Sequence, residues 1–227
     1  MIHLGSIFGT RIRLEISFLI LAGFFVLVTL EGGAPMREAL LWLPILFISV
    51  LIHELGHAAT LGLLGLGSSL VILGRLGGVT INDHPRRPWQ QVLISVSGPG
   101  ASFALAGLCY LLWVSVPAAR TDPMLTLLVP HLITANIVWG IFNLIPAHPM
   151  DGGQAVHAGL LYLTAPLTAF RISVWSSIVL SAALLIFGLL YRQFLLAIIA
   201  GLFVMENWSR LRSLTARDEG SSEDETR

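Results

Sequence analysis

Residues 39–66 read ALLWLPILFISVLIHELGHAATLGLLGL. This stretch is apolar almost throughout and exceeds the roughly 20 residues of α-helix needed to cross a hydrocarbon core. It nevertheless contains His53, Glu54 and His57. An acidic side chain in the middle of a membrane helix costs roughly 3 kcal/mol to insert, so such residues usually mark a functional site. The stretch therefore predicts a membrane-spanning helix with chemically active side chains.

The spacing of these three residues indicates which chemistry to expect. Residues four apart point from one face of an α-helix, about one turn from each other, so both imidazoles can reach one metal ion. Glu54 is offset by about 100° and can reach a metal-bound water without acting as a ligand. This His-Glu-x-x-His pattern is typical of zinc hydrolases.

Two histidines leave a hydrolytic zinc site incomplete, because such sites normally have three protein ligands. Residues 143–153, NLIPAHPMDGG, contain a candidate for the third ligand, Asp151. By composition alone this segment predicts a turn. With the N-terminus in the cytoplasm, however, the second and fourth expected spans both run from outside to inside. Asp151, which follows the fourth span, then lies at a membrane depth similar to that of His53 and His57, so its carboxylate is a candidate third ligand.

The composition of the whole chain also indicates a membrane protein. Of its 227 residues, 55% are hydrophobic and 11% are charged, against about 25% charged residues in a soluble domain. We expect a single all-α polytopic membrane domain over residues 1–214 with about six transmembrane helices, followed by a short polar tail at 215–227 that is disordered. The expected spans are residues 16–30, 39–66, 91–116, 125–144, 171–190 and 194–208.

Residues 70–81, LVILGRLGGVTI, differ from the rest because they are rich in β-branched residues and glycine. They predict one or two short strands, a small β-hairpin inserted between the second and third spans. An edge strand near a membrane active site could pair with an unwound substrate. An ordinary connecting hairpin fits the same residues equally well.

Arginine placement predicts the orientation. The chain has thirteen arginines and no lysine. If the N-terminus is cytoplasmic, only Arg37, Arg120 and Arg192 lie outside, as the positive-inside rule expects. We therefore expect a multi-pass protein of the cell membrane with both termini in the cytoplasm. The sequence contains neither a basic helix nor a stretch in which aromatic and basic residues alternate, so we expect no nucleic-acid partner.

Several short motifs together resemble the site-2 protease family of intramembrane zinc metalloproteases. The similarity extends over residues 8–153, roughly two-thirds of the chain. The matching segments are HELGH at 53–57, LGGV at 76–79, SGP at 97–99, NLIP at 143–146 and PMDGG at 149–153.

The resemblance implies a role for each matching residue. His53, His57 and Asp151 would bind one zinc ion per chain, and Glu54 would act as the general base. Apart from what the resemblance implies, Asn143 is our own candidate for holding the substrate backbone or the oxyanion, and it fits capping or packing of the fourth span equally well. The family cleaves membrane-spanning segments of other proteins, so the implied partners are a membrane-protein substrate, the lipid bilayer and a possible regulatory membrane protein.

The chain departs from the family pattern at three places. Ser102 stands where the family often has asparagine, and Gln154 where it commonly has arginine. His148 occupies a place that is usually apolar. It fits three interpretations, which are a competing ligand, a gate and a partly hydrated loop residue. The small residues 98–102 fit close helix packing, or else a substrate path.

Two other functions remain open at this stage. A zinc transporter also places His and Glu on membrane helices, but the outer halves of the expected spans contain almost no further candidate ligands apart from His131. A catalytically inactive, protease-like binding protein would retain the fold, but the intact Glu54 argues against it.

Overall fold

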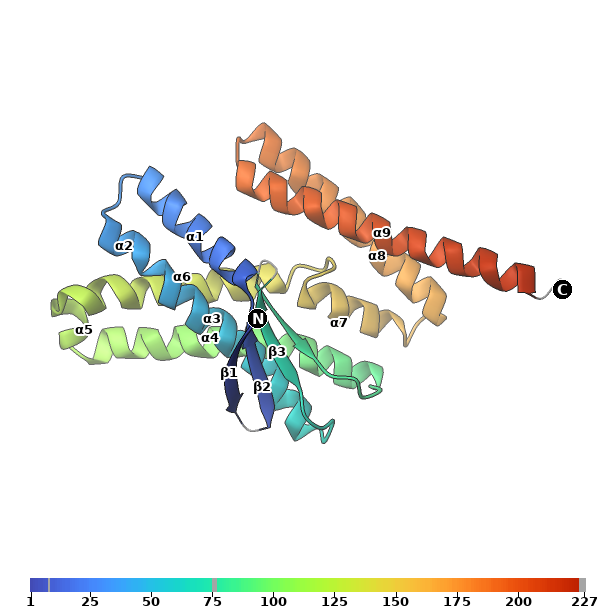
Figure 1. The fold of residues 1–227 in the computed structure, drawn as a ribbon, viewed down its shortest axis with the longest axis horizontal. Coiled ribbons are helices and arrows are strands. Elements are labelled where there is room, and N and C mark those ends of the chain that lie inside the picture. The colour runs from blue at the N-terminus through green and yellow to red at the C-terminus, as the bar shows by residue number, and fades with distance from the viewer. Residues whose placement is uncertain (8, 75–76, 225–227) are drawn as a thin grey trace. The chain divides into compact units, whose positions relative to one another are not determined.

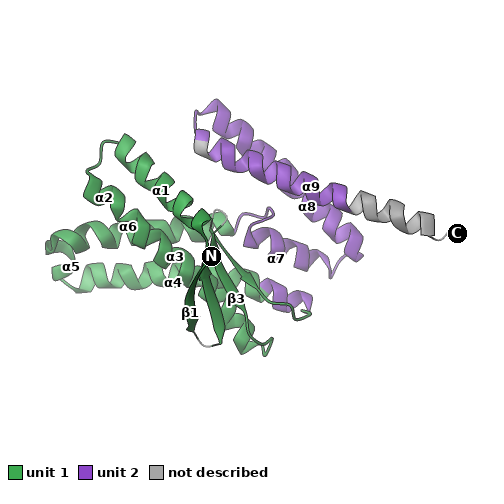
Figure 2. Cartoon of the chain, viewed as in Figure 1, with its two compact units in different colours: residues 1–86, 93–143 green, residues 87–92, 144–227 purple. Residues whose placement is uncertain are grey.

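The computed structural model describes residues 1–7, 9–74 and 77–224, with side chains for all of these except Leu195 and 214–224. The chain forms two compact units (Figure 2). Unit 1 contains residues 1–86 and 93–143, and unit 2 contains residues 87–92 and 144–227. The single protease domain expected over residues 1–214 stays a prediction.

Unit 1 contains a small four-stranded sheet in the order β1-β2-β3-β4 (Figure 1). Strands β1 and β2 pair antiparallel, β2 and β3 parallel, and β3 and β4 antiparallel. The strands expected within residues 70–81 are confirmed as β3 and β4, whereas β1 and β2 were not predicted. Arg75 and Leu76, between β3 and β4, lie outside the described residues. The strands are β1 (Ile2–Ile7), β2 (Thr10–Leu14), β3 (Leu70–Gly74) and β4 (Gly77–Ile81).

Helices make up the rest of unit 1, and the first turn of α4 belongs to unit 2. Apolar side chains of the sheet, the first helix and the third helix form one buried cluster, which holds α3 against the sheet. Close packing of these side chains stabilises the contact through many small dispersion interactions. The cluster includes Ile12, Val71, Phe18 and Val50. The helices are α1 (Ile16–Glu31), α2 (Met36–Leu40), α3 (Trp42–Leu63), α4 (Pro88–Ser115), α5 (Ala118–Thr121) and α6 (Pro123–Asn143).

Unit 2 consists mainly of a short helix, α7 (Asp151–Leu160), and a hairpin of α8 (Pro166–Leu190) and α9 (Phe194–Asp224). A Cβ atom on Gly188 would lie 2.8 Å from the backbone nitrogen of Ala197, so the glycine lets the two helices approach closely. The helix α7 was not expected, because residues 143–153 predicted only a turn. The side chains of the tail at 215–227 lie outside those described, and its disorder stays a prediction.

Four helical segments within the described residues are long and apolar enough to cross a membrane: 36–63, 88–115, 123–143 and 166–190. They correspond to the second, third, fourth and fifth expected spans, and their mean hydropathy is 1.7 to 2.2. Pro99 and Pro130 lie inside two of them, which membrane helices tolerate. The chain is therefore a multi-pass membrane protein. Helix α1 is apolar but has only 16 residues, so the count of six spans is not established.

Candidate metal centre

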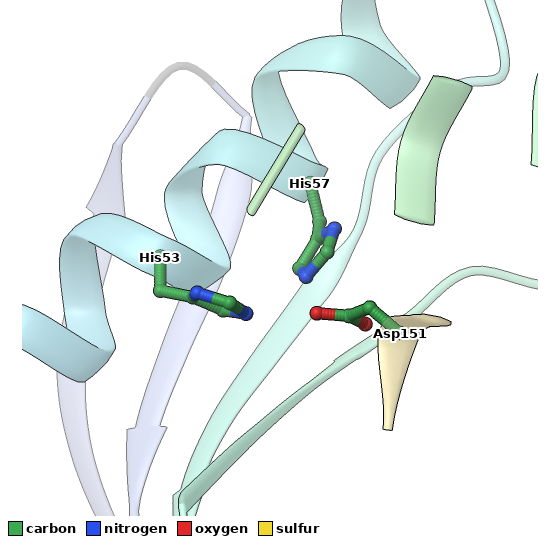
Figure 3. Close-up of side chains that lie close together, drawn as sticks. All are labelled: His53, His57 and Asp151. Atoms are coloured by element: carbon green, nitrogen blue, oxygen red, sulfur yellow. The ribbon is translucent and has the colours of Figure 1, made fainter. Parts of the chain in front are cut away.

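The two histidines of the helical motif lie on α3 as the spacing predicts. His53 is 2% exposed and His57 is 6% exposed. Their ring centroids are 5.0 Å apart with an interplanar angle of 78°. Two buried imidazoles therefore project together from one face of α3 (Figure 3).

Helix α4 orients both rings through their Nδ1 atoms. His57 Nδ1 lies 2.7 Å from the carbonyl oxygen of Ile94, and His53 Nδ1 lies 3.1 Å from Ser102 Oγ. Because a carbonyl oxygen only accepts, His57 Nδ1 must carry the proton, which leaves the Nε2 lone pair for a metal ion. Such partners commonly fix metal-ligating histidines. In the sequence, Ser102 stands out only as a departure from the family pattern, because spacing along the chain does not reveal a partner 49 residues away.

Close backbone packing brings α4 to this position. A Cβ atom on Gly98 would overlap the His57 ring and lie 2.8 Å from His53 Nε2. A Cβ atom on Gly56 would lie 2.6 Å from the carbonyl oxygen of Ser97. These contacts support helix packing as the role of the small residues near Gly98.

Strand β4 holds Glu54, which is 5% exposed. Thr80 Oγ1 donates to Glu54 Oε2 at 2.7 Å and lies 3.2 Å from the Glu54 backbone oxygen. A Cβ atom on Gly78 would lie 2.6 Å from Oε1 of the same carboxylate. One edge strand of the sheet thus fixes both carboxylate oxygens, one by a hydrogen bond and the other by backbone packing.

Asp151 is the first residue of α7 and is 9% exposed. The preceding turn is closed by hydrogen bonds from the Ala147 nitrogen to the Ile145 oxygen at 2.7 Å and from the Met150 nitrogen to the Ala147 oxygen at 2.9 Å. This turn lies directly on the first turn of α7, because a Cβ atom on Gly152 would lie 2.5 Å from the Ile145 oxygen.

His53, His57 and Asp151 form a group that could hold a metal ion. One ligand atom from each residue lies within 4.8 Å of the others (Figure 3). Two imidazole nitrogens and one carboxylate oxygen are a donor set of hydrolytic zinc sites. The residues present therefore fit zinc.

Asn143, the remaining expected site residue, donates from Nδ2 to the Trp139 oxygen at 2.9 Å, within its own helix. This bond agrees with the alternative in which Asn143 caps the end of its own helix. A role in substrate positioning stays a prediction.

Of the three interpretations of His148, the partly hydrated loop residue is contradicted, because the residue is only 6% exposed. The Nε2 atom lies 2.7 Å from Ser173 Oγ. Burial, with smaller contributions from Arg210 and His157, lowers the pKa of His148 to about 4. The ring is therefore neutral at physiological pH.

Comparisons with known proteins give a consistent result. The sequence model of peptidase family M50 matches residues 42–121. A zinc metalloprotease of Methanocaldococcus jannaschii is 32% identical over 206 residues, which are 89% of this chain and 58% of the relative. The putative zinc metalloprotease Rip3 of Mycobacterium tuberculosis is 32% identical over 172 residues, 70% of this chain and 43% of the relative. The chain thus spans about half the length of the curated relatives it matches.

A solved structure is also similar to this chain. The site-2 protease from Methanocaldococcus jannaschii superposes with a TM-score of 0.65 at 27% identity. The match covers 92% of this chain and 94% of that chain.

Proposed function

Because this chain belongs to the site-2 protease family, peptidase family M50, we propose that it is an intramembrane zinc endopeptidase. Its substrate is a membrane protein, cleaved in or near a transmembrane segment. The observation that carries this proposal is a zinc-hydrolase motif on a buried face of α3, a helix that belongs to a candidate membrane span.

We assign zinc binding to His53, His57 and Asp151, one ion per chain. The grouping of their ligand atoms within 4.8 Å supports the assignment, as does the orientation of the histidines by Ser102 and Ile94. When bound, zinc lowers the pKa of a coordinated water and polarises the scissile carbonyl.

Glu54 is the general base in this proposal. Its carboxylate accepts a proton from the attacking water and returns it to the leaving amine. Thr80 and Gly78 hold the carboxylate on α3 from β4. A helical peptide bond is shielded by its own hydrogen bonds, so the substrate must unwind locally before cleavage, and the edge strand β4 offers backbone groups for an extended segment.

The finer membrane topology also belongs to the proposal. We place α1 and the apolar part of α9 across the membrane in addition to the four longer segments, with both termini in the cytoplasm of the cell. Regulation by a second membrane protein is compatible with this arrangement.

The two rival functions differ from the protease in specific ways. A transporter needs further ligands along a route across the membrane, but His131 packs against Trp42, with ring centroids 5.6 Å apart, and bonds within its own helix to the Leu127 oxygen. An inactive binding protein does not require a general base held by two residues of a neighbouring strand.

Zinc content per chain of the purified protein tests the ligand assignment. We expect about one zinc ion in the parent and its loss in both His57→Ala and Asp151→Ala, because two remaining ligands bind zinc weakly. Full retention of zinc by Asp151→Ala would contradict the assignment, and His148 would then be the next ligand to substitute.

Glu54→Gln separates the three functions. The protease should keep zinc and lose cleavage of a panel of tagged single-span membrane proteins reconstituted with it. Zinc uptake into vesicles by the Glu54→Gln variant would favour a transporter. If the parent also cleaves no member of the panel and still binds one of them, the inactive binding protein is favoured.

A further inference from the structure

A second buried polar network lies in unit 2, around His148. Its backbone N–H donates to Ser177 Oγ at 2.9 Å, and its backbone oxygen accepts from Asn207 Nδ2 at 2.7 Å. Its ring Nε2 lies 2.7 Å from Ser173 Oγ. Three side chains from α8 and α9 therefore hold both backbone polar groups and the ring of one residue in the turn before α7.

The network is deeply buried. Ser177 and Asn207 are 0% exposed, and Ser173 is 1% exposed. The hydroxyl of Ser177 also donates to the Ser173 oxygen at 2.7 Å, and the Asn207 amide donates to the Phe203 oxygen at 2.8 Å. These second bonds fix the side chains that hold His148. A buried polar group that loses its partner pays its full desolvation cost, so this arrangement strongly favours one position of the turn.

The position of the turn determines the position of Asp151. A Cβ atom on Gly153 would lie 2.5 Å from the Ala147 carbonyl carbon and would overlap the His148 nitrogen. A Cβ atom on Gly152 would lie 2.5 Å from the Ile145 oxygen. The backbone of the turn thus packs directly against Gly152 and Gly153, with no side chain between them. A shift of His148 would therefore move the start of α7.

We infer that the α8–α9 hairpin positions the third zinc ligand, with Ser177 and Asn207 as the positioning residues and His148 as the residue through which they act. This inference rests on the proposed function, because it takes Asp151 as a ligand. It gives a specific role to two helices whose sequences contain none of the assigned ligands.

The chain offers a matched control for Ser177. Ser181 lies one turn further along α8 and is also 0% exposed, but its hydroxyl has no hydrogen-bond partner among the described residues. Ser177→Ala and Ser181→Ala remove the same atom from the same helix at the same burial. Only the first variant removes a bond to the turn.

The experiment measures the zinc affinity of the whole 227-residue chain in detergent by competition with a chromophoric chelator. We expect Ser177→Ala and Asn207→Leu to weaken zinc binding about 10- to 100-fold, as loss of outer partners of metal ligands commonly does. Ser181→Ala should retain the affinity of the parent. Equal affinities of Ser177→Ala and Ser181→Ala, whether both high or both low, would overturn the inference.

A double-mutant cycle separates positioning of Asp151 from general loss of folding. In an Asp151→Ala background, Ser177→Ala should cause no further loss of zinc affinity, because the ligand through which it acts is absent. A further loss by the same factor would show that Ser177 acts independently of Asp151 and would overturn the inference. An unchanged zinc affinity of Asp151→Ala alone would instead show that the proposed site is wrong.

Discussion

At the scale of the single residue, the absence of a side chain at Gly98 shapes the site. A Cβ atom there would overlap the His57 ring and lie 2.8 Å from His53 Nε2. We expect Gly98→Ala to displace the imidazoles and lower zinc per chain to well below that of the parent. The measurement is zinc content of the purified variant, together with its helicity to confirm folding.

Gly100→Ala is the control on the same helix, because apart from the neighbouring backbone of α4 itself no described atom lies within 4 Å of the Cβ position at Gly100. Alanine is favoured over glycine by about 1 kcal/mol in a helix interior, so this variant should bind zinc like the parent. Equal zinc content in the two variants would show that the close contact at Gly98 does not matter.

The residues that could be predicted from the sequence are those whose chemistry follows from local spacing. His53, Glu54 and His57 are one and four residues apart on a helix, and helix geometry alone brings them to one region. The partners Ser102 and Thr80 could not be predicted. Ser102 lies 49 residues along the chain from His53, and Thr80 lies 26 residues from Glu54. Such contacts depend on tertiary packing, which leaves no periodic signal in the chain.

At the scale of the element, β4 connects the sheet to the proposed general base. Thr80→Val keeps the shape of the side chain and removes the hydroxyl that donates to Glu54 Oε2 at 2.7 Å. A hydrogen bond to a charged group contributes about 1.5–3 kcal/mol, so kcat should fall about 10- to 100-fold while zinc content stays at the parent level. Steady-state kinetics on a cleaved reporter provide the measurement.

Thr80→Ser provides the control, because it keeps the hydroxyl and removes only a methyl group. It should restore most of the kcat lost in Thr80→Val, with little change in KM for either variant. If the valine variant is as fast as the parent, or the serine variant as slow as the valine variant, the hydroxyl of Thr80 is not what positions Glu54.

The elements themselves were unevenly predictable. Long apolar segments such as α3 and α6 follow from hydropathy, and the β-branched residues of β3 and β4 indicate strands. Strands β1 and β2 precede the first apolar span and gain stability from pairing with each other and with β3. Helix α7 follows two prolines and contains two glycines near its start. Local propensity disfavours a helix there, and packing of the preceding turn overrides it.

At the scale of the whole molecule, polar groups are arranged in a chain that is mostly apolar. Unit 1 has a network around the histidines and Glu54, and unit 2 has another around His148. A membrane interior offers no water to satisfy buried polar groups, so they must pair within the protein. Ser102 of α4 and Ser177 of α8 lie in these networks, whereas large apolar side chains such as Val179 and Leu190 remain exposed on α8.

The buried network of unit 2 predicts how stability of the molecule depends on pH. The pKa of His148 is lowered to about 4 by burial and by the neighbouring Arg210 and His157, whereas an unfolded histidine has a pKa of about 6.5. The unfolded state therefore binds a proton first as pH falls. The stability gained from a neutral His148 is fully present above pH 6.5 and is lost progressively toward pH 4, by about 2 kcal/mol at pH 5.

The effect is measured on metal-free protein in a chelator, so that release of zinc at low pH does not contribute to the change in stability. We expect the melting temperature of the parent to fall more between pH 7.5 and pH 5 than that of His148→Gln, whose amide does not titrate but can still reach Ser173. Every side chain other than that of residue 148 is the same in both proteins, so the difference between their pH profiles belongs to His148. Parallel profiles over this range would mean that His148 takes up a proton equally easily in the folded and unfolded protein, and that burial in the network does not hold its ring neutral.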